Sequence, residues 1–388
     1  MSGADCSTTG SYMPRTDDPS RLTKVYLHLD RLADNMRLLQ QQAGGRELWP
    51  CIKANAYGHG ADIIARHLYR LGYTTFCVAD VGEAMALLDA GVDATFIVLS
   101  AMLTEHIPAL VKYGCEPVLC THELVDALAE EAERRGKRIA VHIKVDSGMG
   151  RIGIRPEQLP EFVSHCRARP SLRLRGIMSH FACADEEDKA FSYRQIENFN
   201  NALAQTQCDS LVIRHMANSA AIFDLPKAGF DACRPGISIY GLRPSHDILN
   251  PAVNHLKPVL EWKTRIVYLK EVASDFGLSY GRTFITDKPS LIATVPLGYG
   301  DGFSRRLSNN VDLLIGGQRC PQVGRITMDM SLVDVTELRG TVNIGDEAVI
   351  IGEQNGLEIG ADELAAKLGT INYEIVTAIS QRSPRIVV

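Results

Sequence analysis

The pattern of hydrophobic and polar positions changes once along this chain. From about residue 31 to residue 240, short apolar runs alternate with stretches in which apolar residues recur every three to four positions. The first pattern is typical of buried strands and the second of amphipathic helices, so the alternation predicts parallel βα units. Eight runs are predicted strands, at residues 48–53, 75–79, 95–99, 116–119, 138–145, 173–180, 211–215 and 233–240.

Between these runs, helical periodicity predicts helices that cover a parallel sheet. They are expected at residues 31–41, 61–71, 82–90, 121–135, 156–167 and 189–205, after a starter strand at 25–29. Eight parallel strands with covering helices indicate a TIM-like (β/α)8 barrel, although an open doubly wound sheet fits the pattern nearly as well.

From about residue 256 the pattern becomes a strict alternation of apolar and polar residues, which predicts a mainly antiparallel β domain. Strands are expected at 260–268, 291–297, 323–335 and 347–351, with a helix at 362–368 and a hairpin turn at Gly316-Gly317. We therefore predict a flexible tail at 1–24, a barrel at 25–255 and a C-terminal β domain at 256–388.

Composition narrows the class of function. The 388 residues are 45% hydrophobic and 22% charged, as in ordinary globular proteins. The 41 basic and 46 acidic residues give a net charge of -5, which provides no basic field for nucleic acid or anionic lipid. The 10 cysteines form no C-x-x-C pair, and neither a secretory signal nor a long apolar segment is present. These features predict a soluble, cytoplasmic protein that acts on a small molecule.

Polar residues occur where the predicted barrel strands end, which is where barrels place their active sites. They are Lys53, Lys144, Asp146, His180, His215 and Arg234. In Cys51-Ile-Lys-Ala-Asn-Ala-Tyr-Gly-His-Gly60 an apolar strand leads to Lys53 and then to a glycine-bearing turn. Partial burial favours the neutral amine of a lysine, which is the form that makes a Schiff base. A lysine that reaches out to solvent is the competing interpretation.

Two loops near the last strands suit a phosphate group. Asn218-Ser219 and Pro235-Gly236-Ile237 could offer a hydroxyl and backbone N–H groups, as barrels commonly do at this place, although ordinary tight turns have the same composition. A Schiff-base lysine together with a phosphate site points to pyridoxal phosphate.

Several segments, in this order along the chain, closely resemble the alanine racemase family. The resemblance runs from about residue 22 to the C-terminus. It is carried by Ile52-Lys-Ala-Asn-Ala-Tyr-Gly-His-Gly60, Lys144-Val-Asp-Ser-Gly-Met-Gly-Arg-Ile-Gly153, Ser179-His-Phe-Ala-Cys-Ala-Asp185, His215-Met-Ala-Asn-Ser219, Arg234-Pro-Gly-Ile237, Ser279-Tyr-Gly281, Gly298-Tyr-Gly-Asp-Gly302, Gly324-Arg-Ile-Thr-Met-Asp329 and Asn372-Tyr-Glu374.

The resemblance implies a homodimeric enzyme that depends on pyridoxal phosphate (fold type III), with a barrel and a β domain that contributes to the partner subunit's active site. It implies that Lys53 carries the cofactor and exchanges the Cα proton on the D-alanine face, while Tyr280 from the other subunit works on the L-alanine face. His180 and Arg234 would draw the proton from this tyrosine, because a tyrosine hydroxyl with a pKa of about 10 is a poor base. Arg234 would also face the pyridine nitrogen of the cofactor.

Further roles follow from the same resemblance. The phosphate would be bound by Tyr57, Ser219, Gly236, Ile237 and Tyr373. Arg151 and the backbone of Met328 would hold the substrate, and Lys144 matches a lysine that is often carbamylated. Tyr299 and Tyr373 would narrow the entrance to the site, with Asp185, Arg305, Arg325 and Ile371 further out. Two departures from the family pattern are Gly300, where alanine is common, and Thr327, where Cys or Ser is frequent.

The expected function is therefore interconversion of L- and D-alanine, which supplies D-alanine for peptidoglycan. The nearest alternative is a racemase of serine, lysine or arginine with a wider pocket. A decarboxylase of the same cofactor fold would need a glycine triplet that this chain lacks. A metal-dependent barrel hydrolase could recruit His59, His180, His215 and Asp185, and a cofactor carrier without catalysis is a further alternative.

Overall fold

The computed structural model describes residues 20–206 and 210–388. Contacts divide the chain into two compact units, His28–Val259 and Leu260–Val388, the second of which includes the N-terminal segment up to Leu27. Most of the predicted tail, residues 1–24, lies outside the described residues. In the described ranges every helix is too short or too polar to cross a membrane.

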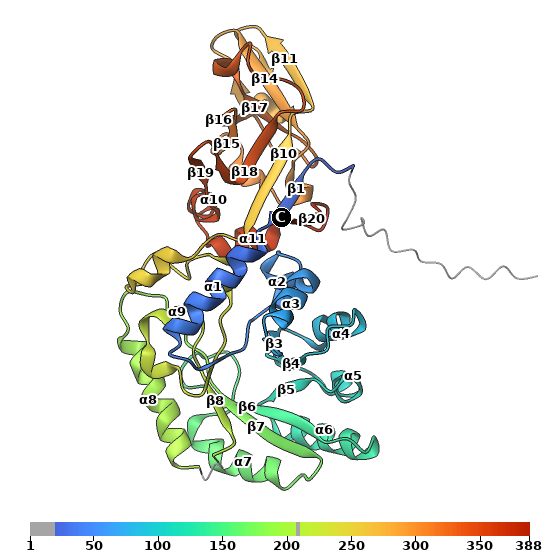
Figure 1. Cartoon of the computed structure of the whole chain (residues 1–388), viewed down its shortest axis with the longest axis vertical. Coiled ribbons are helices and arrows are strands. Elements are labelled where there is room, and N and C mark those ends of the chain that lie inside the picture. Colours follow the sequence, from blue (N-terminus) through green and yellow to red (C-terminus); the bar gives the residue numbers. More distant parts are fainter. Residues whose placement is uncertain (1–19, 207–209) are drawn as a thin grey trace, which may run out of the picture. The chain divides into compact units, whose positions relative to one another are not determined.

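The unit His28–Val259 is built on a sheet of parallel strands (Figure 1). In the described chain a parallel bridge between Cys51 and Cys77 joins the segment after the first strand to the second, and thus connects the two ends of the sheet. The prediction of a TIM-like barrel is confirmed. Its eight strands are β2 (Glu47–Leu48), β3 (Thr75–Val78), β4 (Thr95–Val98), β5 (Glu116–Leu119), β6 (Ile139–Lys144), β7 (Leu172–Met178), β8 (Ile213–His215) and β9 (Ala232–Cys233), in the order β2-β9-β8-β7-β6-β5-β4-β3.

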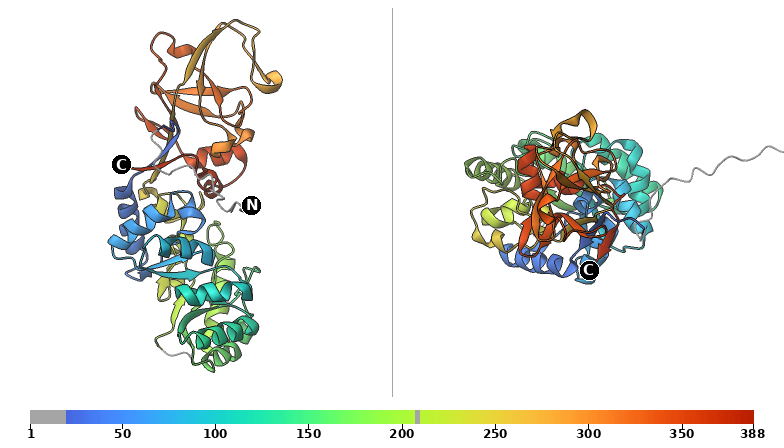
Figure 2. Two further views of the ribbon diagram at one scale, coloured as in Figure 1. Left: turned by 90° about the vertical axis from the view of Figure 1, so that its right-hand side faces the viewer. Right: turned by 90° about the horizontal axis from the view of Figure 1, so that it is seen from above.

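Helices cover the outside of these strands, as the two views in Figure 2 show. They are α1 (Leu29–Gln42), α3 (Ala61–Arg70), α4 (Val81–Asp89), α5 (Ile107–Tyr113), α6 (His122–Arg134), α7 (Leu159–Arg167), α8 (Ala190–Ala204) and α9 (Ser219–Asp224). In α6, the Thr121 side chain caps the first turn, and Leu124, Leu128 and Ala132 form a buried stripe. The sequence pattern did not predict α5 and α9, because helices of 7 and 6 residues are too short to show a clear period.

The prediction for the last barrel strand is wrong in its extent. Residues 233–240 were expected to be one strand, but β9 ends at Cys233 and a 3-10 helix, η4, spans Ile237–Tyr240. Pro235 has no N–H to donate to a ladder, so the sheet pairing stops there. All four residues of η4 are buried. A short run of residues that are all buried has no helical periodicity, so its hydrophobic pattern cannot be distinguished from that of a buried strand.

The second unit contains a mainly antiparallel sheet, as predicted. Its strands run in the order β11-β14-β17-β16-β15-β18-β10-β1-β20, with β19 beside β18 and a separate hairpin of β12 and β13. The bounds are β1 (Lys24–Leu27), β10 (Leu260–Arg265), β11 (Tyr268–Val272), β12 (Gly277–Leu278), β13 (Phe284–Ile285), β14 (Ser290–Val295), β15 (Asp312–Ile315), β16 (Gln318–Val323), β17 (Ser331–Asp334), β18 (Glu347–Gln354), β19 (Leu357–Ile359) and β20 (Arg385–Val387).

The starter strand does not belong to the barrel, where the prediction had placed it. In β1, Val25 pairs with Trp262 of β10 in antiparallel orientation and with Arg385 of β20 in parallel orientation. The boundary between the units also lies at Val259, rather than near residue 255. The sequence of a four-residue strand does not indicate which sheet it joins, since either sheet would bury the same side chains.

Turns in the second unit explain the remaining differences. Gly316 and Gly317 have φ of +59° and +76° between β15 and β16, which confirms the predicted hairpin turn. The single strand predicted at 323–335 is instead the end of β16, a loop and β17. The predicted helix is α10 (Ala361–Leu368), and a second helix, α11 (Asn372–Ala378), was not predicted.

Candidate active site

The polar residues expected at the barrel rim follow the carboxyl ends of their strands. Lys144 is the last residue of β6 and His215 the last of β8, while His180 lies two residues after β7 and Arg234 directly follows β9. These strands are neighbours in one parallel sheet, so their carboxyl ends meet at the same rim. Arg234 connects them: its Nη1 lies 2.7 Å from His215 Nδ1, and its Nη2 lies 3.4 Å from His180 Nδ1.

Lys53 opens a short turn, α2 (Lys53–Tyr57), instead of ending a strand as predicted. The four residues after it, Ala54, Asn55, Ala56 and Tyr57, have φ of 52°, 54°, 54° and 51°, which is the left-handed region. This conformation costs an L-residue roughly 1–2 kcal/mol. Four successive residues of this kind are unusual, and such strain is typical of functional sites.

Specific hydrogen bonds hold this left-handed turn. The carboxylate of Glu83, in α4, accepts from the Ala54 N–H at 2.6 Å and from the Ala79 N–H at 2.7 Å. The side chain of Asn55 accepts from the Ala61 N–H at 2.8 Å. Glu83 was not among the predicted residues, because a glutamate in a helical pattern is usually a solvated surface residue.

The turn ends beside the loops that were predicted to bind phosphate. A side chain carbon added to Gly236 would lie 2.6 Å from the hydroxyl of Tyr57. The Tyr57 hydroxyl therefore lies close to the backbone of Gly236, and only a glycine at this position leaves room for it. Ser219 Oγ accepts from the N–H of Gly236 at 2.8 Å and from that of Ser238 at 3.4 Å. Ile237 lies between them as the first residue of η4. Two hydroxyls and adjacent N–H groups thus form a cradle whose chemistry fits the phosphate of pyridoxal phosphate.

Lys144 has unusual surroundings for a lysine. Its side chain is buried, and its Nζ has no hydrogen-bond partner among the described residues. Burial, together with the charges of Arg234 and Arg151, lowers the pKa of Lys144 well below its ordinary value. Asp146 does not neutralise it by contact, because its carboxylate accepts from the N–H groups of the loop 148–150 at 2.8–3.1 Å. The rim therefore holds a buried amine whose surroundings favour its neutral form.

The same charges act on His180. Burial, together with the charges of Arg234 and Arg151, lowers the pKa of His180 well below its ordinary value. Burial also lowers the pKa of Arg234, although a guanidinium remains protonated at neutral pH. The rim is thus a basic environment in which a neutral histidine lies next to a charged arginine.

The histidines proposed for a metal site have other partners. His59 is buried and stacks on Tyr240, with ring centroids 4.3 Å apart, and His215 bonds Arg234. Asp185 lies in the loop between β7 and α8. In the described part of the chain no group of three or more His, Cys, Asp and Glu side chains is placed to hold a metal ion.

The predicted residues of the second unit lie on connected loops. The Tyr299 N–H donates to the Thr327 carbonyl at 3.0 Å, and the Gly300 N–H donates to the Met328 carbonyl at 2.9 Å. Ser279, next to Tyr280, donates from its hydroxyl to the Arg325 carbonyl at 2.6 Å. The structure therefore brings the segments around Tyr280, Tyr299 and Met328 together.

These side chains are accessible within the chain. Tyr280 is 72% exposed, Met328 54% and Ile371 60%, which is unusual for residues of this size. Arg305 begins the short helix η8 (Arg305–Leu307), and Tyr373 lies in the first turn of α11. Large apolar side chains left exposed in this way are typical of a surface that meets a partner or a ligand.

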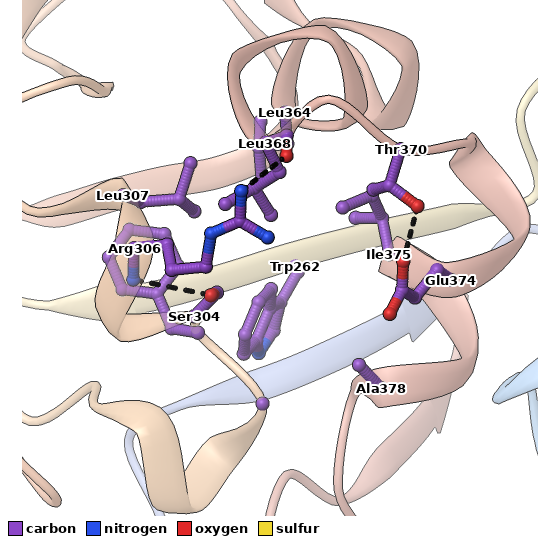
Figure 3. A pocket seen from close by; sticks show the side chains of 12 residues that line it. Trp262, Ser304, Arg306, Leu307, Leu364, Leu368, Thr370, Glu374, Ile375 and Ala378 are labelled. Carbon is purple, nitrogen blue, oxygen red and sulfur yellow. Dashed lines mark hydrogen bonds between the residues drawn. The ribbon is translucent and has the colours of Figure 1, made fainter.

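A separate cavity of about 230 Å³ lies within the second unit, between η8 and the helices α10 and α11 (Figure 3). Trp262 is at its floor, and Arg306 and Glu374 lie on opposite sides of it. The Arg306 guanidinium donates to the Leu368 carbonyl at 3.1 Å. None of the residues predicted for catalysis or cofactor binding lines this cavity, so it is distinct from the candidate site.

Both units of the chain resemble known proteins. Residues 27–244 match the family model "Alanine racemase, N-terminal domain", and residues 259–387 match "Alanine racemase, C-terminal domain". The chain is 40% identical to an alanine racemase of Clostridium novyi, over 93% of this chain and 94% of the relative. It is 42% identical to an alanine racemase of Halothermothrix orenii, over 94% and 97% of the two chains.

Solved structures show the same likeness. The alanine racemase of Clostridium difficile 630 has a TM-score of 0.89 at 33% identity, covering 95% of this chain and 96% of that one. The alanine racemase of Bacillus anthracis, with bound L-Ala-P, has a TM-score of 0.87 at 35% identity, covering 95% of each chain. The chain therefore belongs to the alanine racemase family, the isomerases of pyridoxal phosphate fold type III.

Proposed function

We propose that this protein interconverts L-alanine and D-alanine with pyridoxal phosphate as its cofactor. The observation that carries the proposal is the segment from Lys53 to Tyr57, where one strained turn begins with an amine and ends with a hydroxyl at the Gly236 cradle. This arrangement matches a cofactor that has an aldehyde at one end and a phosphate at the other. The family match over most of the chain supports it.

The residues of the rim suit this cofactor, which makes the Cα proton of a bound amino acid acidic by withdrawing electrons. Lys53 would hold the cofactor covalently through its amine. Its phosphate would be bound by Tyr57, Ser219, Gly236, Ile237 and Tyr373. Arg234 would face the pyridine nitrogen and, because a guanidinium keeps its protons, would leave that nitrogen unprotonated. An unprotonated ring is a weaker electron sink, which disfavours transamination.

Racemisation needs two acid/base groups on opposite faces of Cα. Lys53 would exchange the proton on the face of D-alanine, and Tyr280 from the other subunit would exchange it on the face of L-alanine. The high exposure of Tyr280 in the single chain supports a role at an interface. His180 and Arg234 would make the tyrosine a better base, since the neutral His180 can accept a hydrogen bond from its hydroxyl and the positive charge of Arg234 favours its ionised form.

Substrate binding would rest on Arg151 and on the backbone of Met328, both toward the carboxylate. We propose that Lys144 is carbamylated, because a buried neutral amine is nucleophilic toward CO2 and the resulting carbamate would pair with Arg151. The C–N bond would form as the amine loses a proton. The change turns a neutral amine into an anion that attracts the Arg151 guanidinium.

The entrance would be narrowed by Tyr299 and Tyr373, with Asp185, Arg305, Arg325 and Ile371 further out. Aromatic rings at this position favour a substrate with a methyl side chain over serine, lysine or arginine. We further propose a cytoplasmic homodimer that supplies D-alanine for peptidoglycan. The described cysteines are free thiols, which supports a reducing compartment.

Proton NMR in D2O tests the proposal. Purified protein supplied with pyridoxal phosphate is incubated separately with L-alanine, L-serine, L-lysine and L-arginine, followed by chiral analysis. We expect Cα deuteration of alanine with formation of D-alanine, and neither in a Lys53→Ala variant. Faster exchange of another amino acid would keep the mechanism and change the substrate, whereas no exchange with any of them would refute the racemase proposal.

A further inference from the structure

Arg234 is buried without a carboxylate beside it. Its hydrogen bonds within the described residues go to the Ser179 and Met216 carbonyls and to the rings of His180 and His215. A buried cation normally needs a compensating charge. The nearest anion that is connected to Arg234 by hydrogen bonds is Glu116, and two histidines lie between them.

The connection is continuous and lies in the interior of the barrel. Arg234 Nη1 lies 2.7 Å from His215 Nδ1, and His215 Nε2 lies 2.9 Å from His142 Nδ1. His142 Nε2 lies 3.0 Å from Glu116 Oε2, which also accepts from Arg175 Nη1 at 2.6 Å. His142 and His215 have no exposed surface, and Glu116 is 6% exposed. Water therefore does not compete with these bonds.

Packing keeps the two rings in place. The ring of Trp49, which is fully buried, meets His142 and His215 edge to face with centroids 5.8 Å and 4.7 Å apart. His142 in β6 reaches His215 in β8 past the intervening strand β7, where Gly176 is opposite it. A side chain carbon added to Gly176 would lie 2.3 Å from His142 Nδ1. Because Gly176 has no side chain, the His142 ring has room to form its hydrogen bond with His215 across β7.

The donors and acceptors can be assigned from chemistry alone. Arginine only donates, so His215 Nδ1 must accept, and a neutral His215 then carries its proton on Nε2. That proton is donated to His142 Nδ1, so His142 also carries its proton on Nε2 and donates it to Glu116. If Glu116 were protonated and the bonds ran in the reverse direction, each histidine would carry its proton on Nδ1. The Nδ1–H of His215 would then face an N–H of Arg234, and two donors repel each other.

The charges of the buried groups agree with this direction. Burial lowers the pKa of both histidines, so they are neutral at neutral pH. Burial alone would raise the pKa of Glu116, but the hydrogen bond from His142 and the charge and hydrogen bond of Arg175 outweigh it and leave the pKa below its ordinary value. Glu116 is therefore an anion.

We propose that Glu116 is a positioning residue: through His142 and His215 it gives Arg234 a fixed hydrogen-bond acceptor and so orients the guanidinium toward the cofactor ring. The chain of bonds holds for the protein as such, whereas its effect on the cofactor rests on the proposed function. Glu116 would touch neither substrate nor cofactor. It acts by fixing which ring nitrogen of each histidine carries the proton.

Solid-state 15N NMR of protein labelled in its histidine rings tests the chain of bonds, because protonated and unprotonated ring nitrogens differ widely in chemical shift. The signals of the two rings are assigned by their disappearance from the spectra of the His142→Asn and His215→Asn variants. We expect Nε2–H for both in the wild type, with or without pyridoxal phosphate, and the same in Glu116→Gln, whose amide oxygen still accepts. Glu116→Met, which has no strong acceptor, should give a mixture. Unchanged protonation in Glu116→Met would overturn the proposal.

A second measurement tests the consequence for the cofactor. In holoenzyme, Glu116→Met should lower kcat for alanine about tenfold with little change in KM, and should shift the 15N signal of labelled cofactor ring nitrogen. Glu116→Gln should restore both. If Glu116→Met folds poorly, Gly176→Ala breaks the same route while Glu116 and Arg175 stay in place. A normal ring-nitrogen signal and kcat in both variants would refute the positioning role.

Asp126 offers a matched control in the same unit. Its carboxylate also joins a histidine and an arginine, His165 at 2.8 Å and Arg169 at 2.6 Å, but on the outer helices. Asp126→Met should leave kcat and the protonation of His142 and His215 unchanged. If the wild type does not racemise alanine but its histidines carry their protons as expected, only the proposed function fails.

Discussion

At the scale of single residues, the rim of the barrel shows how strongly surroundings change chemistry. Lys144 and Arg234 are both buried basic residues. Arg234 has four hydrogen-bond partners in the described chain, whereas Lys144 Nζ has none. The lysine can lose its proton, because an ammonium loses its charge more readily than a guanidinium. Only the lysine is therefore available as a nucleophile.

This difference predicts carbamylation that depends on pH. In the presence of 13C-bicarbonate, the wild type should show a carbamate signal in 13C NMR at pH 8, because the lowered pKa of Lys144 favours its neutral amine. On acidification below that lowered pKa the amine becomes protonated, so the signal should be lost. Lys144→Ala should show no such signal at any pH, and a signal that persists in this variant would assign the carbamate to another lysine.

The departure at Gly300 also has a residue-scale reason. A side chain carbon at this position would lie 2.1 Å from Arg382 Nη1, and Arg382 donates to Asp329 at 2.7 Å. Glycine therefore leaves room for this ion pair next to Met328. For the second departure, Thr327, the hydroxyl donates to the Met330 carbonyl at 2.8 Å and accepts from the Met330 N–H at 3.1 Å, so it closes the same loop.

At the scale of elements, the left-handed turn after Lys53 is the feature that places the site. No residue in it is a glycine, and its conformation depends on the hydrogen bonds of Glu83 and Asn55. The lysine and the loops of the phosphate cradle are predictable from the sequence, because the residue types and their order are local. The left-handed conformation is not, since Ala-Asn-Ala-Tyr has no local preference for it.

Substitution of Ala54 tests the strain in this turn. Ala54 is exposed and has φ of 52°, where a β-branched side chain is strongly disfavoured. We expect Ala54→Val to lower the free energy of unfolding by about 2 kcal/mol, and Ala54→Gly to leave it nearly unchanged or raise it. Urea denaturation measures both. Equal stability of the valine and glycine variants would show that the turn is not strained in solution.

The cradle itself can be tested at Gly236. Gly236→Ala would place a carbon 2.6 Å from the Tyr57 hydroxyl and push that ring away. We expect the affinity for pyridoxal phosphate to fall about tenfold, equivalent to roughly 1.4 kcal/mol. Gly360→Ala is a suitable control, because the nearest atom to its added carbon is 3.9 Å away. Equal cofactor affinity in the two variants would contradict the proposed phosphate site.

At the scale of the whole molecule, the two units carry different parts of the proposed mechanism. Lys53, Arg234 and the phosphate cradle belong to the barrel, whereas Tyr280 and Met328 belong to the β domain, where they are exposed. If each site combines the barrel of one subunit with the β domain of the other, neither subunit has a complete site alone. The homodimer is then required for catalysis.

Mixing two inactive variants tests this arrangement. Lys53→Ala and Tyr280→Phe homodimers should each lack racemase activity, but a mixed dimer has one site with both residues intact. After subunit exchange, half of the dimers are mixed, so about a quarter of the wild-type activity should return. Size-exclusion chromatography checks that the proteins remain dimeric. No recovery after proven exchange would show that Lys53 and Tyr280 act in the same subunit.

The sequence by itself determined the alternation of strands and helices in the first unit, the change to an antiparallel domain near residue 256 and the identity of the polar residues near the strand ends. These properties depend on periodicity and on motifs of a few residues, which are written locally in the chain. Tertiary structure alone decided that β1 pairs with β10 and β20, that Glu83 holds the turn after Lys53, and that Glu116 lies at the end of the bonds from Arg234. Each of these depends on contacts between segments that are distant in the sequence. The residues next to Glu83, Glu116 or β1 in the sequence do not indicate which distant segment they contact.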